Sequence, residues 1–157
     1  MNLSLRSATA EDAQRVADIL IGTRAEFMPY APSAHAEAEV RQWVATSLVP
    51  GGGVVVAEFD GKVVGVMATA TGGAESWINQ MAVDPALVGK SIGSALLSCA
   101  LTRLPRPIRL YTFQANVGAR RFYERHGFTA IEFTDGRDNE ERCPDVLYEL
   151  ALVRTEA

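Results

Sequence analysis

The chain has 157 residues, a formal net charge of −4 and an apolar content of 48%, enough for a domain with its own core. The acidic balance and the absence of a lysine or arginine run argue against a nucleic-acid surface. No apolar stretch has the length of a membrane span, and residues 1–6 lack signal-peptide architecture. We expect one cytoplasmic domain over residues 1–157, with neither nucleic acid nor membrane as a partner; a homodimer stays open.

The pattern of apolar and turn residues predicts alternating strands and helices. In chain order these are a strand at 3–6, helices at 9–22 and 34–46, strands at 54–59, 62–71 and 76–83, a helix at 92–104, a strand at 108–113, a helix from 117, and strands at 129–133 and 146–152. Thr9 with Asp12 is typical of a helix N-terminus. Asp60-Gly61 between two apolar segments predicts a tight β-hairpin. The order indicates a mixed α/β fold.

A phosphate-binding turn is indicated where the strand ending at Val83 meets proline, a run of small residues at 88–93 and then a helix. Backbone amides at a helix N-terminus lack partners within the helix and carry the positive end of the dipole, so they can bind a pyrophosphate. Gly89, Ser91 and Gly93 leave room for its approach. An ordinary strand-to-helix connection also needs small residues, so a purely structural role stays open.

The same turn partly copies a P-loop. Gly89-Lys90-Ser91 reproduces the end of that motif, but its opening glycine would fall at Asp84. A proline-containing loop also lacks the run of free amides that wraps a triphosphate. The sequence therefore does not favour a nucleotide triphosphatase.

A short helix is delimited by Asn116, a good N-cap, and by Gly127, which suits the position after the helix. Asn116, Arg120 and Tyr123 follow i, i+4, i+7 spacing and share one face. The residues expected to face the core are Ala119 and Phe122. A packing role for Tyr123, with its hydroxyl bound by a neighbour, is the alternative to a chemical one.

Together and in this order, the two segments resemble the GCN5-related N-acetyltransferase (GNAT) superfamily. Residues 88–93 are similar to its acetyl-CoA turn, Gln/Arg-x-x-Gly-x-Gly/Ala, and residues 116–128 to its motif Asn-x-x-Ala/Gly-x-x-Phe-Tyr-x-x-x-Gly-Phe. Val88 stands where the superfamily has Gln or Arg, and Ser91 where it has Gly. The resemblance implies a mixed, mostly antiparallel sheet of about seven strands, about four helices and a splayed central parallel pair.

The resemblance also implies acetyl-CoA as cosubstrate, with its pantetheine arm along the strand before the turn. The expected cofactor contacts are Met81, Ala82, Val83, Val88, Gly89, Lys90, Ser91, Ile92, Gly93, Ser94, Asn116, Arg120 and Tyr123. A main-chain N–H of that strand would stabilise the tetrahedral oxyanion.

The implied reaction is direct attack of a neutral primary amine on the thioester in a ternary complex. Tyr123 would protonate the departing thiolate. Glu75 would act as base through a water molecule, or it is a solvated carboxylate at a strand end. The residues expected to contact the acceptor are Arg24, Glu26, Phe27, Tyr30, His35 and the loop 135–142, which is otherwise a solvated hairpin loop.

The acceptor amine is not encoded in any motif of the chain. A non-catalytic acyl-CoA-binding or regulatory module of the same fold is the alternative function, and a purely structural domain is a third. Cys99 and Cys143 form no disulfide framework, and they and the two histidines lack metal-ligand spacing. No metal is expected.

Overall fold

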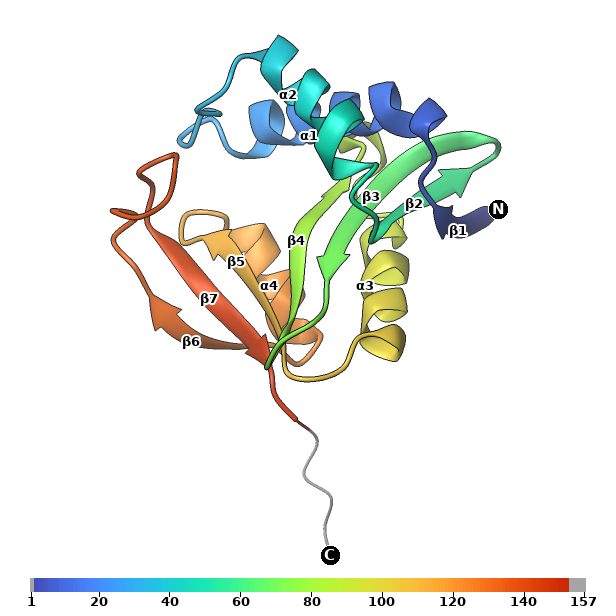
Figure 1. Cartoon of the computed structure of the whole chain (residues 1–157). Coiled ribbons are helices and arrows are strands. Elements are labelled where there is room, and N and C mark those ends of the chain that lie inside the picture. Colours follow the sequence, from blue (N-terminus) through green and yellow to red (C-terminus); the bar gives the residue numbers. More distant parts are fainter. Residues whose placement is uncertain (1, 153–157) are drawn as a thin grey trace, which may run out of the picture. The chain divides into compact units, whose positions relative to one another are not determined.

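The computed structural model describes residues 2–152, and Figure 1 shows its helices and strands. The strands are β1 Leu3–Ser7, β2 Val54–Phe59, β3 Lys62–Ala70, β4 Ser76–Val83, β5 Ile108–Phe113, β6 Thr129–Phe133 and β7 Asp145–Leu150. The helices are α1 Ala13–Phe27, α2 Glu37–Trp43, α3 Ile92–Arg103 and α4 Val117–Arg125, with short helical turns η1 Ala10–Asp12, η2 Val44–Leu48 and η3 Pro85–Leu87. None of the helices in this described part is long and apolar enough to cross a membrane.

The strands are hydrogen-bonded in the order β1-β2-β3-β4-β5-β7-β6, which confirms the mixed α/β fold. The chain divides into two compact units: unit 1 holds residues up to 69 and 80–103, and unit 2 holds residues 70–79 and those from 104 onward. Strand β4 therefore contributes its first half to unit 2 and its second half to unit 1. The single domain over residues 1–157 stays a prediction.

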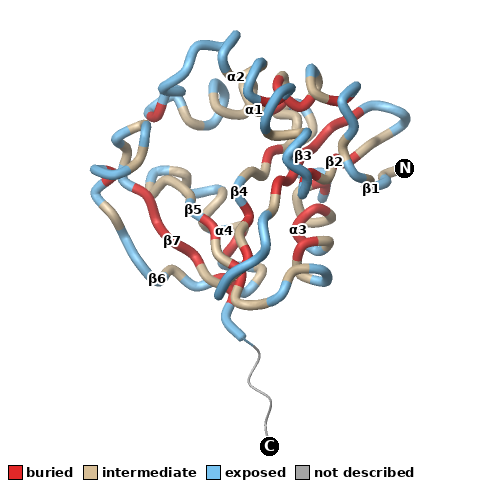
Figure 2. Tube along the Cα trace, viewed as in Figure 1, coloured by how far each residue is buried: buried red, intermediate tan, exposed pale blue. Residues whose placement is uncertain are grey.

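In unit 1, β1, β2 and β3 form an antiparallel meander. The predicted hairpin at Asp60-Gly61 is confirmed, with positive φ angles of 50° and 81°, as its turn type requires. Helix α1 covers one side of this sheet, where Val16 and Ile19 belong to the same buried cluster as Val56. Figure 2 shows buried stretches along β2 and β3.

Helix α3 packs close to the same meander because β3 carries a glycine. A Cβ at Gly65 would lie 3.0 Å from Ile92 Cγ2 and 3.1 Å from Leu96 Cδ1, closer than side-chain atoms approach each other in a packed core. The missing side chain thus lets the first turns of α3 approach the sheet. Through this contact, β3 determines how close the start of α3 lies to the sheet.

In unit 2, β5, β7 and β6 are antiparallel, and β4 joins them in parallel beside β5. The parallel ladder consists of the pairs Ser76–Ile108 and Trp77–Arg109, at the first residues of both strands. β4 and β5 therefore form the parallel pair that the resemblance implies, and the splaying of that pair stays a prediction. Helix α4 packs on the face that carries Tyr148, whose ring centroid lies 6.4 Å from that of Tyr123.

Two predicted helix boundaries were wrong. Helix α1 passes through Gly22 and ends at Phe27, because one glycine costs a helix only about 1 kcal/mol and packing outweighs it. Thr23, in the added turn, donates a hydrogen bond of 3.1 Å to the Val83 carbonyl. The second helix begins after Ala36, whose N–H is bound by the Glu39 carboxylate at 3.1 Å.

Candidate functional site

In unit 1, the segment that follows β4 is held by hydrogen bonds of Asp84. Its N–H donates to the Val64 carbonyl at 2.8 Å, and its carbonyl accepts the Leu87 N–H at 2.8 Å. Its carboxylate accepts the Ala86 N–H at 3.0 Å and pairs with Arg15 of α1. The bond from Ala86, followed by the one from Arg15, lowers the pKa of Asp84. The turn therefore begins from a fixed point where the end of β4 lies beside the first residues of β3.

The turn itself contains two residues with left-handed backbone conformation. Gly89 has a φ of 86° and Ser91 a φ of 66°; glycine adopts this region freely, whereas a side chain makes it costly. The Ser91 carbonyl accepts the Ala95 N–H at 3.1 Å, which is the first helical bond of α3. The amides that follow Ser91 belong to the first turn of α3 and have no acceptor within the helix. Val88 is 56% exposed.

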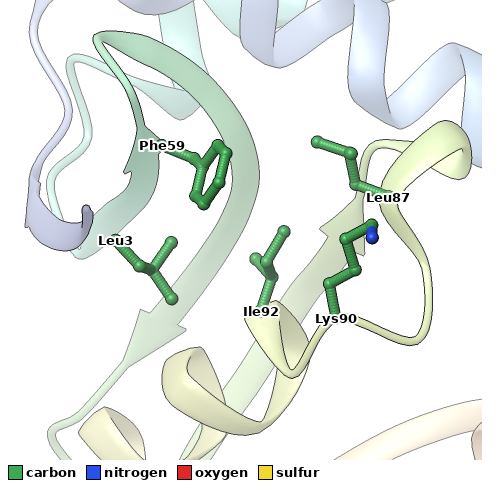
Figure 3. A pocket seen from close by; sticks show the side chains of 5 residues that line it. All are labelled: Leu3, Phe59, Leu87, Lys90 and Ile92. Carbon is green, nitrogen blue, oxygen red and sulfur yellow. The ribbon is translucent and has the colours of Figure 1, made fainter. Parts of the chain in front are cut away.

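Lys90 lies beside a small apolar pocket of unit 1. Leu3, Phe59, Leu87 and Ile92 line this pocket together with Lys90, and Figure 3 shows the lysine side chain extending alongside Leu87. The lining offers no carboxylate or amide to fix a polar ligand, so the pocket serves to pack the lysine stem. Lys90 itself is exposed, which leaves its ammonium accessible to solvent.

The second half of β4, which the resemblance assigns to pantetheine, also lies in unit 1. Ala82 is buried, whereas Met81 and Val83 are half-buried. The Val83 carbonyl accepts the hydroxyl of Thr23, and the Asp84 N–H that follows is bound to β3. The strand is therefore anchored at its last residues, directly before the turn.

In unit 2, Tyr123 is the buried residue of α4. It is 8% exposed, with ring centroids of Phe128 at 5.8 Å and Tyr148 at 6.4 Å. Burial raises the pKa of Tyr123, so the phenol keeps its proton throughout the neutral range. Ala119 and Phe122, expected in the core, are only half-buried; that expectation was wrong because the Tyr123 ring fills the place between the helix and β7.

Asn116 is the predicted N-cap of α4, and its Oδ1 accepts the Ala119 N–H at 3.3 Å. Gly127 has a φ of 93°, which confirms the predicted end of the helix. Because the Asn116 side chain oxygen is used in capping, its amide nitrogen is the group left for a contact with pantetheine. That contact stays a prediction.

Arg120 is held by neighbours on the sheet side of α4. Its Nε donates to the Tyr148 hydroxyl at 3.1 Å and its Nη1 to the Gln114 carbonyl at 3.3 Å, and its guanidinium lies 5.5 Å from the centroid of Phe133. The Tyr148 hydroxyl in turn donates to Glu124 at 2.6 Å. Through these contacts Arg120 attaches α4 to β7. Its contact with a phosphate of the cofactor stays a prediction.

Glu75 lies half-buried directly before β4 in unit 2. The pKa of Arg109 is raised, mainly by its hydrogen bond to Glu149 and further by the nearby charge of Glu75. Trp77, two residues further on, stacks on Tyr111 with centroids 5.9 Å apart. The sequence analysis did not identify Tyr111. It lies two residues after Arg109 in β5, so both side chains are on the same face of the strand.

The predicted acceptor-binding residues are distributed over both units. Arg24 donates a hydrogen bond to the Ala31 carbonyl at 3.0 Å, which folds the chain after α1 back on the helix. Of the predicted residues in this region, Glu26, Phe27, Tyr30 and His35 are exposed. In unit 2 the loop 135–142 is braced by Asn139, which donates to Cys143 at 2.6 Å and to Asp145 at 3.1 Å.

Comparison with solved structures extends over nearly the whole chain. The apo form of YjaB from Escherichia coli matches with a TM-score of 0.76 at 22% identity, covering 95% of this chain and 97% of that one. The PaiA N-acetyltransferase of Thermoplasma acidophilum in complex with coenzyme A matches with a TM-score of 0.76 at 18% identity, covering 97% and 100%. Naa50 of Arabidopsis thaliana in complex with the bisubstrate analogue CoA-Ac-MVNAL matches with a TM-score of 0.70 at 16% identity, covering 97% and 100%.

At these low sequence identities, the three comparisons show that the fold is similar and nothing more. A comparison with curated proteins found no match. The family model of the acetyltransferase (GNAT) family matches residues 20–128, a range that includes β4, the turn, α3, β5 and α4. By that match over more than half of its length, the chain belongs to the acetyltransferase (GNAT) family.

Proposed function

We propose that the chain is an acetyl-CoA-dependent N-acetyltransferase that transfers the acetyl group to a primary amine by direct attack in a ternary complex. Membership of the acetyltransferase family supports this. Two proteins of similar fold were solved with coenzyme A or a CoA-containing bisubstrate analogue. The observation that carries the proposal is the turn from Gly89 to the start of α3, whose small residues and unpaired amides suit a pyrophosphate.

The turn would bind the pyrophosphate through the amides of 89–94. Its left-handed residues, Gly89 and Ser91, bring successive N–H groups to one side of the chain. Lys90, exposed beside them, adds a positive charge. Val88 offers no polar side-chain atom, so binding would depend on the backbone. Met81, Ala82 and Val83 would bind the pantetheine arm through main-chain groups, with Asn116 adding a hydrogen bond.

Tyr123 would supply the proton for the leaving group. The neutral amine nitrogen attacks the thioester carbonyl, forming the C–N bond, while a main-chain N–H of β4 stabilises the oxyanion. The C–S bond then breaks, and the sulfur takes the phenolic proton of Tyr123. The surplus proton on the nitrogen leaves through water, with Glu75 as the proposed base. The raised pKa of Tyr123 ensures that the phenol holds its proton before the reaction.

The acceptor would be contacted by the segment after α1 and by the loop before β7. The proposed contact residues are Arg24, Glu26, Phe27, Tyr30, His35 and those of 135–142. Phe27 and Tyr30 are 41% and 42% exposed, so both rings reach the surface.

Binding is tested first by thermal unfolding with acetyl-CoA and no added metal. A ligand at 100 times its Kd adds about 2.7 kcal/mol to the unfolding free energy, which a melting curve resolves. Val88→Arg should tighten binding by adding a charge-assisted phosphate contact. A shift produced by ATP with magnesium but not by acetyl-CoA would overturn the proposal.

Turnover is tested by thiol release from acetyl-CoA over a panel of primary amines, with mass spectrometry of the acetylated product. The alternative function, a non-catalytic acyl-CoA-binding module, is motivated by Val88 and Ser91, which depart from the family turn. Binding of acetyl-CoA without thiol release for any amine would favour that alternative.

A further inference from the structure

An aromatic stack lies on one face of the sheet of unit 2. Trp77 of β4 and Tyr111 of β5 have ring centroids 5.9 Å apart and an interplanar angle of 12°. Tyr111 nevertheless remains 53% exposed. An exposed aromatic ring that a neighbour already orients is a suitable surface for a ligand, since little side-chain entropy is lost on binding.

The register of the strands shows which residues lie next to this stack on the sheet. Tyr111 is opposite Leu147 of β7, which is in turn opposite Glu132 of β6. Neighbouring strands are about 4.8 Å apart, so Tyr111 and Glu132 flank a buried leucine at about 10 Å between their Cα atoms. Glu132 is exposed. Burial, followed by the charge of Glu132, raises the pKa of Tyr111.

This face is acidic. The charged residues that β5, β6 and β7 place on it are Arg109, Glu132, Asp145 and Glu149. Arg109 is neutralised by Glu149, whose Oε2 accepts from its Nε at 2.8 Å. Asp145 is buried and bound by Asn139 and Thr134. Glu132 has no ion pair among residues 2–152, so of these four residues it is the one whose charge is available to a cation.

We propose that Tyr111, stacked on Trp77, and Glu132 together bind an alkylammonium group of the acceptor. A cation between these two exposed side chains could contact the tyrosine ring, at the separation of up to about 6 Å that cation–π attraction requires, and also the carboxylate. This inference rests on the proposed N-acetyltransferase function and specifies its acceptor. The ring and the charge both attract a cation and offer nothing to a carboxylate or phosphate.

The amine that is acetylated must be neutral when it attacks. An ammonium held by the ring and Glu132 is therefore a second amino group of the same molecule. The acceptor class that follows is a small alkyl diamine or polyamine. A monoamine has a single nitrogen, which cannot be held here as an ammonium and attack the thioester as a neutral amine at the same time.

Binding is measured without acetyl-CoA by titrating 1,4-diaminobutane and, as the matched uncharged ligand, 1,4-butanediol. Calorimetry gives the Kd, and Trp77 fluorescence locates the ligand in a Trp43→Phe background, since Trp43 is the other tryptophan. We expect the diamine to bind more tightly than the diol and to change the Trp77 emission. Equal affinity of the two ligands, or an unchanged emission, would overturn the proposal.

Variants test the two groups separately. Tyr111→Leu and Glu132→Gln should each weaken diamine binding by about threefold or more. Tyr111→Phe retains the ring and should stay within about twofold, and Glu11→Gln, an exposed glutamate of η1 in unit 1, is the charge control. If Tyr111→Leu and Glu132→Gln bind the diamine as tightly as the parent chain, the assignment is wrong.

The two proposals fail differently. A chain that binds the diamine at this face but releases no thiol from acetyl-CoA contradicts the N-acetyltransferase function and leaves the cation site in place. A chain that acetylates 1,4-diaminobutane with a KM unchanged by Tyr111→Leu and Glu132→Gln retains the proposed function and contradicts the cation site.

Discussion

Arg15 and Asp84 form an ion pair that joins helix α1 to the residue directly after β4. The Arg15 Nε also donates to the Val63 carbonyl of β3 at 2.8 Å, and the partly buried side chains are 27% and 18% exposed. One guanidinium therefore ties α1, β3 and the start of the turn together. The proposed pyrophosphate amides follow within ten residues of this pair, so the ion pair acts on them as a positioning contact.

We predict that Arg15→Leu and Asp84→Asn both lower stability and show a coupling free energy of about 1 kcal/mol in a double-mutant cycle. Urea unfolding of the parent, the two variants and the double variant gives this coupling. Acetyl-CoA affinity should fall in both single variants, because the turn loses its fixed starting point. Arg121→Leu, at an exposed arginine of α4, serves as control, and additive effects of the two variants would contradict the pairing.

We predict that Ser91→Gly stabilises the protein by about 0.5 to 1 kcal/mol. Ser91 has a φ of 66°, where its Cβ is strained and glycine is not. Ser98→Gly is a matched control, because Ser98 is exposed within α3 and the same substitution should destabilise there by about 0.5 kcal/mol. Equal destabilisation by both changes in thermal unfolding would show that the turn residue is unstrained.

We predict that Tyr123→Phe lowers turnover by about 10²-fold or more while the Kd of acetyl-CoA changes little. Burial raises the pKa of Tyr123, so its acid form persists and no alkaline loss of activity due to Tyr123 should appear below pH 10. The measurement is thiol release as a function of pH, with an amine for which chemistry limits the rate.

Tyr148→Phe is the matched control for Tyr123→Phe. The Tyr148 hydroxyl accepts from Arg120 and donates to Glu124, so its loss should cost about 1 to 2 kcal/mol of stability and leave turnover within about tenfold. Unchanged turnover in Tyr123→Phe would assign that residue a packing role.

We predict that Asp12 contributes about 1 to 2 kcal/mol to stability at neutral pH, a value that allows for solvent screening at the half-buried Arg6. The Arg6 guanidinium, bonded at 2.7 Å, together with the Thr9 N–H, lowers the pKa of Asp12 from 3.8 to about 2. Because the folded pKa lies below the unfolded one, this contribution is complete above pH 4 and is lost as the pH falls towards 2.

The measurement for Asp12 is urea unfolding at pH 7, 4 and 2.5. Asp12→Asn should be less stable than the parent at pH 7, and the difference should shrink by pH 2.5. A difference that does not depend on pH would show that the charge of Asp12 contributes nothing, and Glu11→Gln controls for a change of net charge.

The sequence by itself determined those features that depend on residues close in the chain. Asp60-Gly61 specified a hairpin because only certain residues adopt its φ angles, and Asn116 and Gly127 delimited α4 through caps that contact the nearest turn. The turn at 88–93 was identified for the same reason. These signals need no knowledge of what packs against the segment.

The tertiary structure decided which side chains are buried and which distant residues meet. Gly22 did not end α1, because the helix that continues is held by Thr23 at β4. Tyr123 is buried in place of Phe122, since the space beside Tyr148 determines which ring fits. Arg15 and Asp84 are 69 residues apart in sequence, and no local pattern marks such a pair. Contacts of this kind arise from packing between elements, which a residue's near neighbours in sequence do not encode.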